Sequence, residues 1–283
     1  MFDLLHWKIR QMLCPFKRAV APSQWLMNLD VPAYTEPSNP DLTLRQTHLL
    51  EAFPHFNDLP PSWGWVKLES LYQLDQIARL LETHPIPQAK TCHWVDVGSK
   101  NGATLGACLA VAAQLGEKAQ VTGLEIDTFR YYLDGYTRGD YARGLVKGFA
   151  QTPALKACGG LDFIEADLHT YVQGHPATAD VVSCFLPFVL EKEHTAWGLP
   201  KQDFDPQAFF KSVWGLLKPN GFLLISNLSE DEVHAQRQIL EALEADLPLG
   251  QGMLRHVEAL EVETRFMKCG EEKRFLWMLQ KIS

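Results

Sequence analysis

The sequence predicts an α/β protein with a doubly wound, mostly parallel sheet, an antiparallel C-terminal hairpin and an N-terminal extension of helices and loops. Three observations predict this. From residue 86 onward, short apolar runs alternate with stretches of helical periodicity, which is typical of parallel βαβ units. A turn with two glycines follows the first run, and two β-rich segments end the chain. We therefore expect a main domain at residues 86–283 and an extension at residues 1–85.

The chain begins with a predicted amphipathic helix at residues 2–17. Lys8 and Arg10 interrupt its apolar stretch, which argues against a secretory signal peptide. We expect this helix to pack on its own domain, with contact to an anionic membrane surface as the alternative. Its apolar residues follow helical spacing: Phe2, Leu5, Ile9, Met12, Leu13 and Phe16.

The rest of the extension is predicted to be loops and two helices. Residues 21–61 are rich in Pro, Asn, Asp and Ser, so we expect extended loops around one short helix near Leu44–Ala52. Leucine and isoleucine at helical spacing predict a second helix at Lys67–Thr83, which ends before a His-Pro-Ile-Pro sequence. We expect no separate core in this loop region.

The main domain alternates predicted strands and helices. The strands are short and almost entirely apolar, as buried parallel strands are: His93–Val97, Gln120–Glu125, Leu161–Glu165, Asp180–Cys184 and Phe222–Ser226. The predicted helices are Thr104–Leu115, Asp127–Phe149, Leu168–Gln173, Pro206–Leu217 and Glu230–Ala245. Two β-rich segments, Glu258–Lys268 and Lys273–Lys281, flank a Cys-Gly-Glu-Glu turn and predict an antiparallel pair.

Composition excludes several classes of protein. The formal net charge is −8, with 26 basic residues, so the summed field disfavours a nucleic-acid partner. The six cysteines contain no C-x-x-C pair, which argues against a disulfide framework or a structural zinc site and favours a reducing cytoplasm. No apolar run approaches the roughly 20 residues of a membrane-spanning helix.

The first strand of the main domain ends in a turn that is typical of a ligand site. Asp96 ends the strand, Gly98 allows the chain to turn, and Gly102 opens the next helix. The second strand ends in Glu125, about 20 residues beyond Gly102, where doubly wound folds place an acid on ribose hydroxyls. The alternative for Glu125 is a solvated strand end, and Asp127 is the better helix cap of the two.

These motifs resemble the class I S-adenosylmethionine-dependent methyltransferase family over roughly Cys92 to the C-terminus. VDVGSKNG resembles the glycine-rich first motif, GLEID the ribose-binding acid, FIEADL the third strand, ADVVSCFLPF the fourth, and LLKPNGFLLIS the turn and fifth strand. The resemblance implies a seven-stranded sheet whose last strand is antiparallel. It also implies that S-adenosylmethionine lies across the carboxyl ends of the first two strands.

The resemblance also implies roles for individual residues. Gly98 and Gly102 would line the methionine moiety, with Asp96 holding the turn or reaching the amino group through water. Glu125 would bind the ribose hydroxyls. Asp167 would accept from the adenine amino group or cap the following helix, or do both. The full set of expected cofactor-binding residues is Asp96, Gly98, Ser99, Gly102, Glu125, Ile126, Asp167 and Leu168.

One position departs from the family pattern. The family has a third glycine between the other two, and this chain has Lys100 there, followed by Asn101. A Cβ at this position would crowd the methionine tail if the backbone requires a positive φ. A catalytically silent protein that keeps the fold for binding or as a scaffold is therefore the alternative to an active methyltransferase.

The acceptor site is expected beyond the fourth strand. Ser-Cys-Phe-Leu-Pro-Phe replaces the Asn/Asp-Pro-Pro-Tyr/Phe sequence of amide- and base-directed family members, so those acceptors lose support. The next loop carries His194 as a weak candidate general base, with a solvated loop histidine as the favoured alternative. The Trp63-Gly64-Trp65 segment either covers the acceptor pocket or belongs to an accessory core.

The acceptor itself cannot be named from these residues. We expect a small molecule first, a protein second and RNA third. Tyrosines and arginines interleaved over residues 130–143 could hold a planar or anionic acceptor if they share a helix. The sequence shows no cluster of metal ligands, and its fifth-strand turn and terminal hairpin argue against a nicotinamide-dependent oxidoreductase.

Overall fold

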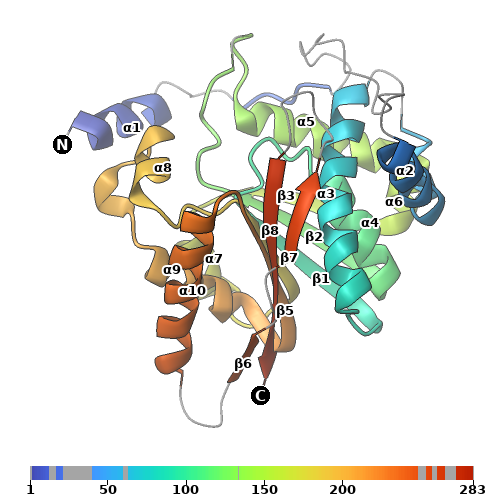
Figure 1. Ribbon diagram of the computed structural model, residues 1–283. Helices are drawn as coiled ribbons and strands as arrows, with labels where there is room; N and C mark the ends of the chain where they lie inside the picture. Colours follow the sequence, from blue (N-terminus) through green and yellow to red (C-terminus); the bar gives the residue numbers. More distant parts are fainter. Residues whose placement is uncertain are drawn as a thin grey trace.

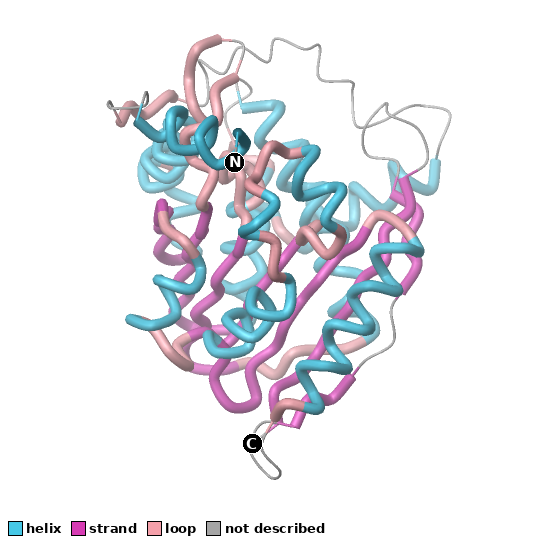
Figure 2. The backbone as a smooth tube through the Cα atoms, turned by 90° about the vertical axis from the view of Figure 1, so that its left-hand side faces the viewer, coloured by secondary structure: helices cyan, strands magenta, loops and turns pink. Residues whose placement is uncertain are grey.

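The computed structural model of the 283-residue chain describes residues 2–12, 17–21, 40–59, 63–132, 134–247, 253–256, 260–264 and 272–282. A single twisted sheet lies between two layers of helices (Figure 1). Figure 2 shows the strands running side by side through the middle of the molecule. Leu13, Phe16, residues 22–39 and 60–61 of the loop region, and residues 265–271 with most of the terminal turn lie outside the described residues.

The strands confirm the prediction that the sheet is mostly parallel. They are β1 (Ala89–Val97), β2 (Gly116–Glu125), β3 (Gly159–Glu165), β4 (Ala179–Phe185), β5 (Leu217–Asn227), β6 (Met253–His256), β7 (Leu260–Thr264) and β8 (Glu272–Ile282). Strands β1 to β5 pair in parallel, in the spatial order β3-β2-β1-β4-β5, and β8 runs antiparallel to β5. The α/β class and the antiparallel C-terminal pair are therefore confirmed.

The predicted number of seven strands is wrong, because the described residues form eight strand segments. The strand next to β8 is divided in two. Its first part, β6, pairs with residues 279–282 of β8, and its second part, β7, pairs with residues 272–276. Both parts run antiparallel to β8. The predicted segment Glu258–Lys268 contains β7, whereas β6 was not predicted.

The helices cover both faces of the sheet. They are α1 (Phe2–Met12), α2 (Pro40–Ala52), α3 (Gly64–Thr83), α4 (Leu105–Leu115), α5 (Arg138–Gln151), α6 (Pro153–Cys158), α7 (Leu168–Gly174), α8 (Glu191–Ala196), α9 (Pro206–Leu216) and α10 (Glu230–Ala245), with short 3₁₀ turns η2 (Pro54–Phe56) and η4 (Lys201–Asp203). No described helix has the combination of length and apolarity that crossing a bilayer requires. In Figure 1, α7, α9 and α10 lie on one side of the sheet and α3, α4 and α5 on the other.

The predicted helix Asp127–Phe149 is wrong in its first half. Thr137 caps α5 through a capping box with Asp140, so the helix begins only at Arg138. Before it, the chain forms a loop in which Gly135 has a φ of +77° and Tyr132 N–H bonds the Tyr136 carbonyl. The tyrosines and arginines of residues 130–143 therefore do not share one helical face.

Two hydrophobic clusters hold the layers together. Successive residues of β1 point to opposite faces, with Trp94 in the cluster under α3 and α4 and Val95 in the cluster under α9 and α10. The N-terminal extension shares the first cluster rather than forming its own. Phe56 and Trp63 both belong to it, and the Trp63 ring lies 5.7 Å from that of Phe149. Trp63 is therefore part of a packed core.

Residues 17–21 dock on α5 through close backbone contacts. Val20 N–H donates to the Asp140 carbonyl, and Arg18 N–H donates to the Asp140 carboxylate. The absence of a side chain at Gly144 permits this approach, because a Cβ there would lie 1.7 Å from the Val20 carbonyl oxygen. The docking places the N-terminal segment across the domain, beside the loops that follow the strands.

Candidate functional site

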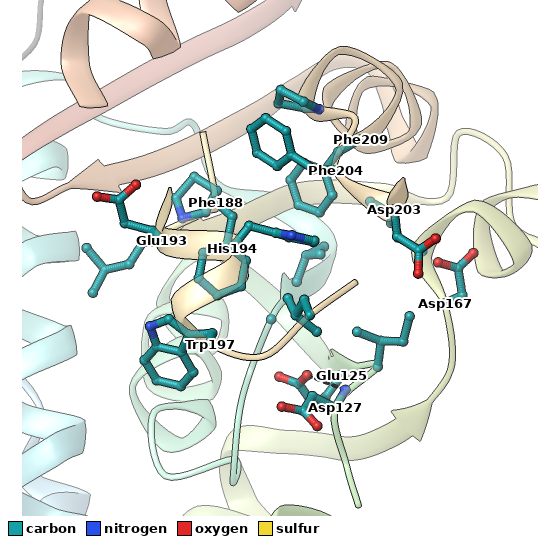
Figure 3. Close-up of a pocket in the computed structure, with 18 of the residues that line it drawn as sticks. Glu125, Asp127, Asp167, Phe188, Glu193, His194, Trp197, Asp203, Phe204 and Phe209 are labelled. Atoms are coloured by element: carbon teal, nitrogen blue, oxygen red, sulfur yellow. Dashed lines mark hydrogen bonds between the residues drawn. The ribbon is translucent and has the colours of Figure 1, made fainter. Parts of the chain in front are cut away.

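A cavity of about 540 Å³ opens at the carboxyl ends of the parallel strands. Every parallel strand contributes its following residues to the wall: Gly98 after β1, Ile126 after β2, Asp167 after β3, Pro187 after β4 and Leu228 after β5. Doubly wound sheets bind ligands at this edge, and the volume is ordinary for a small-molecule site. Figure 3 shows the carboxylates of the β2 and β3 ends and an aromatic group gathered around the cavity.

The glycine turn has three left-handed residues in alternation. Gly98, Lys100 and Gly102 have φ values of +79°, +53° and +77°. Gly98 and Lys100 line the cavity, whereas Gly102 is not among its lining residues and packs against Leu105 and Ala142. The position where the resembling family has a third glycine thus does require a positive φ, and a lysine adopts it.

Glu125 joins the glycine turn to the end of β2. Its side chain is buried and lines the cavity. One carboxylate oxygen accepts from Lys100 N–H at 2.8 Å and the other from Asp127 N–H at 2.7 Å. Burial raises the pKa of this carboxyl, while the two amides and the Arg138 charge oppose that shift. Each oxygen keeps a second lone pair for a ligand hydroxyl.

Asp127 and Arg138 form a second polar group in the wall that sequence patterns did not reveal. Asp127 Oδ2 accepts from Arg130 Nε at 2.6 Å and from Arg138 Nη1 at 3.2 Å. Asp127 Oδ1 and Arg138 Nε are buried and have no hydrogen-bond partner within the described part of the chain. The sequence analysis interpreted Asp127 as the cap of a helix, but no helix starts at this residue.

The ends of β2 and β3 present an apolar pair and a capping acid. Ile126 is 44% exposed, which is unusual for isoleucine, and Leu168 faces the same cavity. Asp167 caps α7, since its Oδ1 accepts from Thr170 N–H at 3.0 Å. Thr170 Oγ1 also approaches this same oxygen, so Oδ2 stays available to a ligand. The capping role predicted for Asp167 is confirmed.

Asp96 at the end of β1 and Ser99 within the glycine turn do not line the cavity. Asp96 is buried and accepts from Ser183 Oγ at 2.5 Å; the same hydroxyl accepts from Trp94 Nε1 at 2.8 Å. Burial raises the pKa of Asp96 to about 7, even though Ser183 and the charge of Lys100 favour its ionised form. The geometry assigns Asp96 to the support of the turn, beneath the surface that a ligand would touch.

The other half of the cavity is aromatic and contains His194. The His194 ring lies 5.7 Å from that of Phe188 and 5.4 Å from that of Phe204. His194 is only 7% exposed, so the expectation of a solvated loop histidine is wrong, because the segment forms helix α8 and turns this ring inward. Burial lowers the pKa of His194 and favours the neutral imidazole. Its Nδ1 has no hydrogen-bond partner among the described residues.

Two segments far apart in sequence cover the cavity. Trp197, directly after α8, lies under three cations, with Arg138 at 5.0 Å, Arg130 at 5.1 Å and Lys100 at 5.6 Å from its ring centroid. Helix α1 lies against the same segment, since Arg10 Nη2 donates to the Gly198 carbonyl at 2.8 Å.

Trp7 of α1 is buried, lines the cavity and packs edge-on against Phe129 at 4.5 Å. Packing of the N-terminal helix on its own domain is confirmed, although Ile9 and Met12 remain exposed. Sequence periodicity predicted this helix, but it did not indicate that the helix would reach the site.

Comparison with known proteins finds similarity of fold without a sequence relative. No protein-family model matches the chain, and no curated protein matches it. An S-adenosylmethionine-dependent methyltransferase from Aquifex aeolicus is 14% identical, with 84% of this chain and 98% of that one covered, at a TM-score of 0.47. A precorrin-6y C5,15-methyltransferase from Geobacter metallireducens is 13% identical, covering 73% and 87%, at 0.43.

A third solved structure, a mutant of a 16S rRNA (adenine(1408)-N(1))-methyltransferase from Catenulisporales acidiphilia, is 14% identical, covering 74% of this chain and 92% of that one, at a TM-score of 0.45. At these values the comparisons concern the fold and support nothing about activity. The antiparallel last strand of the sheet, β8, agrees with what the sequence resemblance implied.

Proposed function

We propose that this chain is an S-adenosylmethionine-dependent methyltransferase that acts on a small molecule. One observation carries the proposal. Glu125, buried at the end of β2, lies in the cavity wall and is hydrogen-bonded to the backbone of the glycine turn at Lys100. Doubly wound folds place a ribose-binding acid at this point, within reach of a turn that carries the charged end of the ligand.

The lining residues fit this cofactor in shape and polarity. Glu125 would bind the ribose hydroxyls, and Gly98 would lie along the methionine moiety without a side chain in the way. Ile126 and Leu168 would enclose the adenine ring, and Asp167 Oδ2 would accept from its amino group. The orphaned Asp127 Oδ1 supports a polar ligand, because a buried oxygen without a partner is costly.

The bound cofactor would supply a methyl group on a positively charged sulfur, ready for direct displacement by a nucleophile. The protein's task is then to align the nucleophile and exclude water. Trp197 and Trp7 cover the cavity, and the carboxylates around it favour a cationic ligand. His194 Nδ1 would take the proton that the acceptor releases, since its imidazole is held neutral by burial.

A small-molecule acceptor follows from the enclosure of the site. The cofactor and acceptor would have to share about 540 Å³, under a cover formed by α1 and α8. A protein acceptor would have to insert a single side chain. A nucleic acid would meet a chain of net charge −8 and a cavity rim rich in acids.

Isothermal titration with S-adenosylmethionine, S-adenosylhomocysteine and NAD tests the proposal. We expect micromolar binding of the two sulfur compounds to the wild type and none of NAD. Glu125→Gln should weaken binding by tenfold or more, because it replaces a carboxylate that accepts two ribose hydroxyls. Glu117→Gln is the matched control, since this exposed glutamate lies near the start of the same strand. Tight NAD binding, or no binding of either sulfur compound, would refute the proposal.

A catalytically silent binding protein is the second candidate, and Lys100 is the observation that favours it. Lys100 adopts the left-handed position between Gly98 and Gly102 and lines the cavity, where its side chain would narrow the space for the methionine tail. The same titration separates the candidates. If S-adenosylmethionine binds to Lys100→Gly but not to the wild type, the protein is a silent scaffold. If it binds to the wild type and its methyl group is transferred, that candidate is excluded.

A further inference from the structure

We propose that the acceptor is an amine carried by a small apolar or aromatic body, held as an ammonium near Glu193 and Glu232 before transfer. This inference rests on the proposed methyltransferase function and names its substrate class. It follows from three properties of the part of the cavity beyond β4: the sign of its charges, the buried carboxylate oxygens of two glutamates, and a histidine surrounded by aromatic rings.

Acids supply the charged side chains that α8, α10 and the segment between α8 and α9 bring to the cavity wall. They are Glu193 and Glu232 from the two helices, and Asp203 and Asp205 from the segment. The lysine and arginine among the lining residues come from the glycine turn and the start of α5, where Arg138 pairs with Asp127 and both cations lie over the Trp197 ring. An organic cation would therefore meet a wall of carboxylates beyond β4, whereas a carboxylate or phosphate ligand would be repelled.

Glu193 and Glu232 both line the cavity, although they come from α8 and α10. Glu232 is 7% exposed. Burial and the charge of Glu193 raise its pKa. The hydrogen bond from Leu228 N–H to Glu232 Oε2 at 2.6 Å and the charge of Arg274 oppose that shift. Lys192 contacts Glu193 Oε1 at 3.4 Å from outside the cavity. Glu193 Oε2 is buried with no hydrogen-bond partner in the described part of the chain. The charge of Glu193 adds to the cost of ionising the buried Glu232, and a cation bound beside both carboxylates would lower that cost.

The rings beside these acids would hold the body of the acceptor. Phe188, Phe204 and Phe209 all line the cavity, and the first two flank His194. Figure 3 shows His194 among these rings, with Glu193 on one side. Aromatic faces attract an ammonium as well as an apolar body, so this lining complements an aralkyl or alkyl amine.

His194 completes the chemistry of an amine acceptor. An ammonium must lose one proton before its nitrogen can attack, and the buried, unpartnered Nδ1 of His194 is available to accept it. The neutral nitrogen then forms a bond to the methyl carbon as the carbon–sulfur bond breaks, and the electron pair stays on sulfur. The products are S-adenosylhomocysteine and a methylated ammonium, so charge and atoms balance.

The test compares ligands that differ only in their charged group. Three bodies, phenylethyl, indolylethyl and hexyl, are each used as the amine, the alcohol and the matching carboxylate. Binding to the protein saturated with S-adenosylhomocysteine is measured by titration, and transfer is followed with methyl-labelled S-adenosylmethionine. We expect at least one amine to bind tenfold or more tightly than its alcohol and carboxylate, and to become methylated.

Variants assign that preference to the glutamates. Glu193→Gln and Glu232→Gln should each reduce amine affinity at least tenfold without changing alcohol binding or S-adenosylhomocysteine binding. Glu241→Gln, an exposed position on the same helix as Glu232, should change none of these. If S-adenosylhomocysteine binds but no body shows a preference for the amine, the inference is wrong and the proposed function stands. Failure of S-adenosylhomocysteine to bind overturns the proposed function itself.

Discussion

Replacement of Lys100 measures the cost of a side chain in the left-handed turn. Its φ of +53° costs an L-residue roughly 1–2 kcal/mol relative to glycine. Glycine in turn loses more entropy on folding, by about 0.4–1 kcal/mol. Lys100→Gly and Lys100→Ala both remove the contact with Trp197, so that contact cancels in their comparison. Lys100→Gly should therefore be more stable than Lys100→Ala by about 1 kcal/mol.

Lys147 provides a matched control, because the stability difference between its glycine and alanine variants should have the opposite sign. This exposed lysine lies inside α5, where the backbone is helical. Glycine there should be less stable than alanine by about 1 kcal/mol. Urea unfolding of the four variants, monitored by circular dichroism, gives both differences. If alanine is at least as stable as glycine at position 100, the backbone there does not adopt the left-handed conformation and the reasoning fails.

Three further predictions concern the support and cover of the site. Because the pKa of Asp96 is about 7 in the folded protein and 3.8 ordinarily, the native state holds this proton more tightly, and stability falls between these pH values as pH rises. The free energy of unfolding, measured with urea, should fall by on the order of a few kcal/mol between about pH 4.5 and 8 in the wild type, and Asp96→Asn should remove this fall. An equal fall in the variant would contradict the prediction. Gly144→Ala should displace residues 17–21 and speed limited proteolysis there, whereas Gly174→Ala, with nothing within 4 Å of the added Cβ, should not; equal cleavage argues against the docking. Trp197→Ala should raise the dissociation rate of S-adenosylhomocysteine severalfold in stopped-flow displacement, because it removes part of the cavity cover, and an unchanged rate would show that Trp197 is not in the exit path.

The sequence predicts the sheet well because buried parallel strands leave a strong local signal. The five apolar runs of the main domain all became strands, and the acid and glycines at their ends came together as expected. The start of α5 was missed for a local reason. Apolar and aromatic spacing continues from residue 127 onward, but the capping box of Thr137 and the left-handed Gly135 fix the helix start at Arg138.

The parts of the site that sequence reasoning missed depend on contacts between distant segments. Nothing near Trp7 indicates that it would meet Phe129, and nothing near Glu193 indicates that it would line the same cavity as Glu232. His194 was expected in solvent because its segment has the composition of a polar loop. Only the packing of α8 against the aromatic group buries it.

The attachment of α1 has a consequence for how ligands enter. Among the described residues, α1 contacts the rest of the protein through the hydrogen bond from Arg10 to the Gly198 carbonyl and the edge-on pair of Trp7 and Phe129. Breaking these two contacts costs on the order of a few kcal/mol, well below the free energy of global unfolding. A substitution at Trp7 or Arg10 would therefore alter ligand exchange in a protein that still folds.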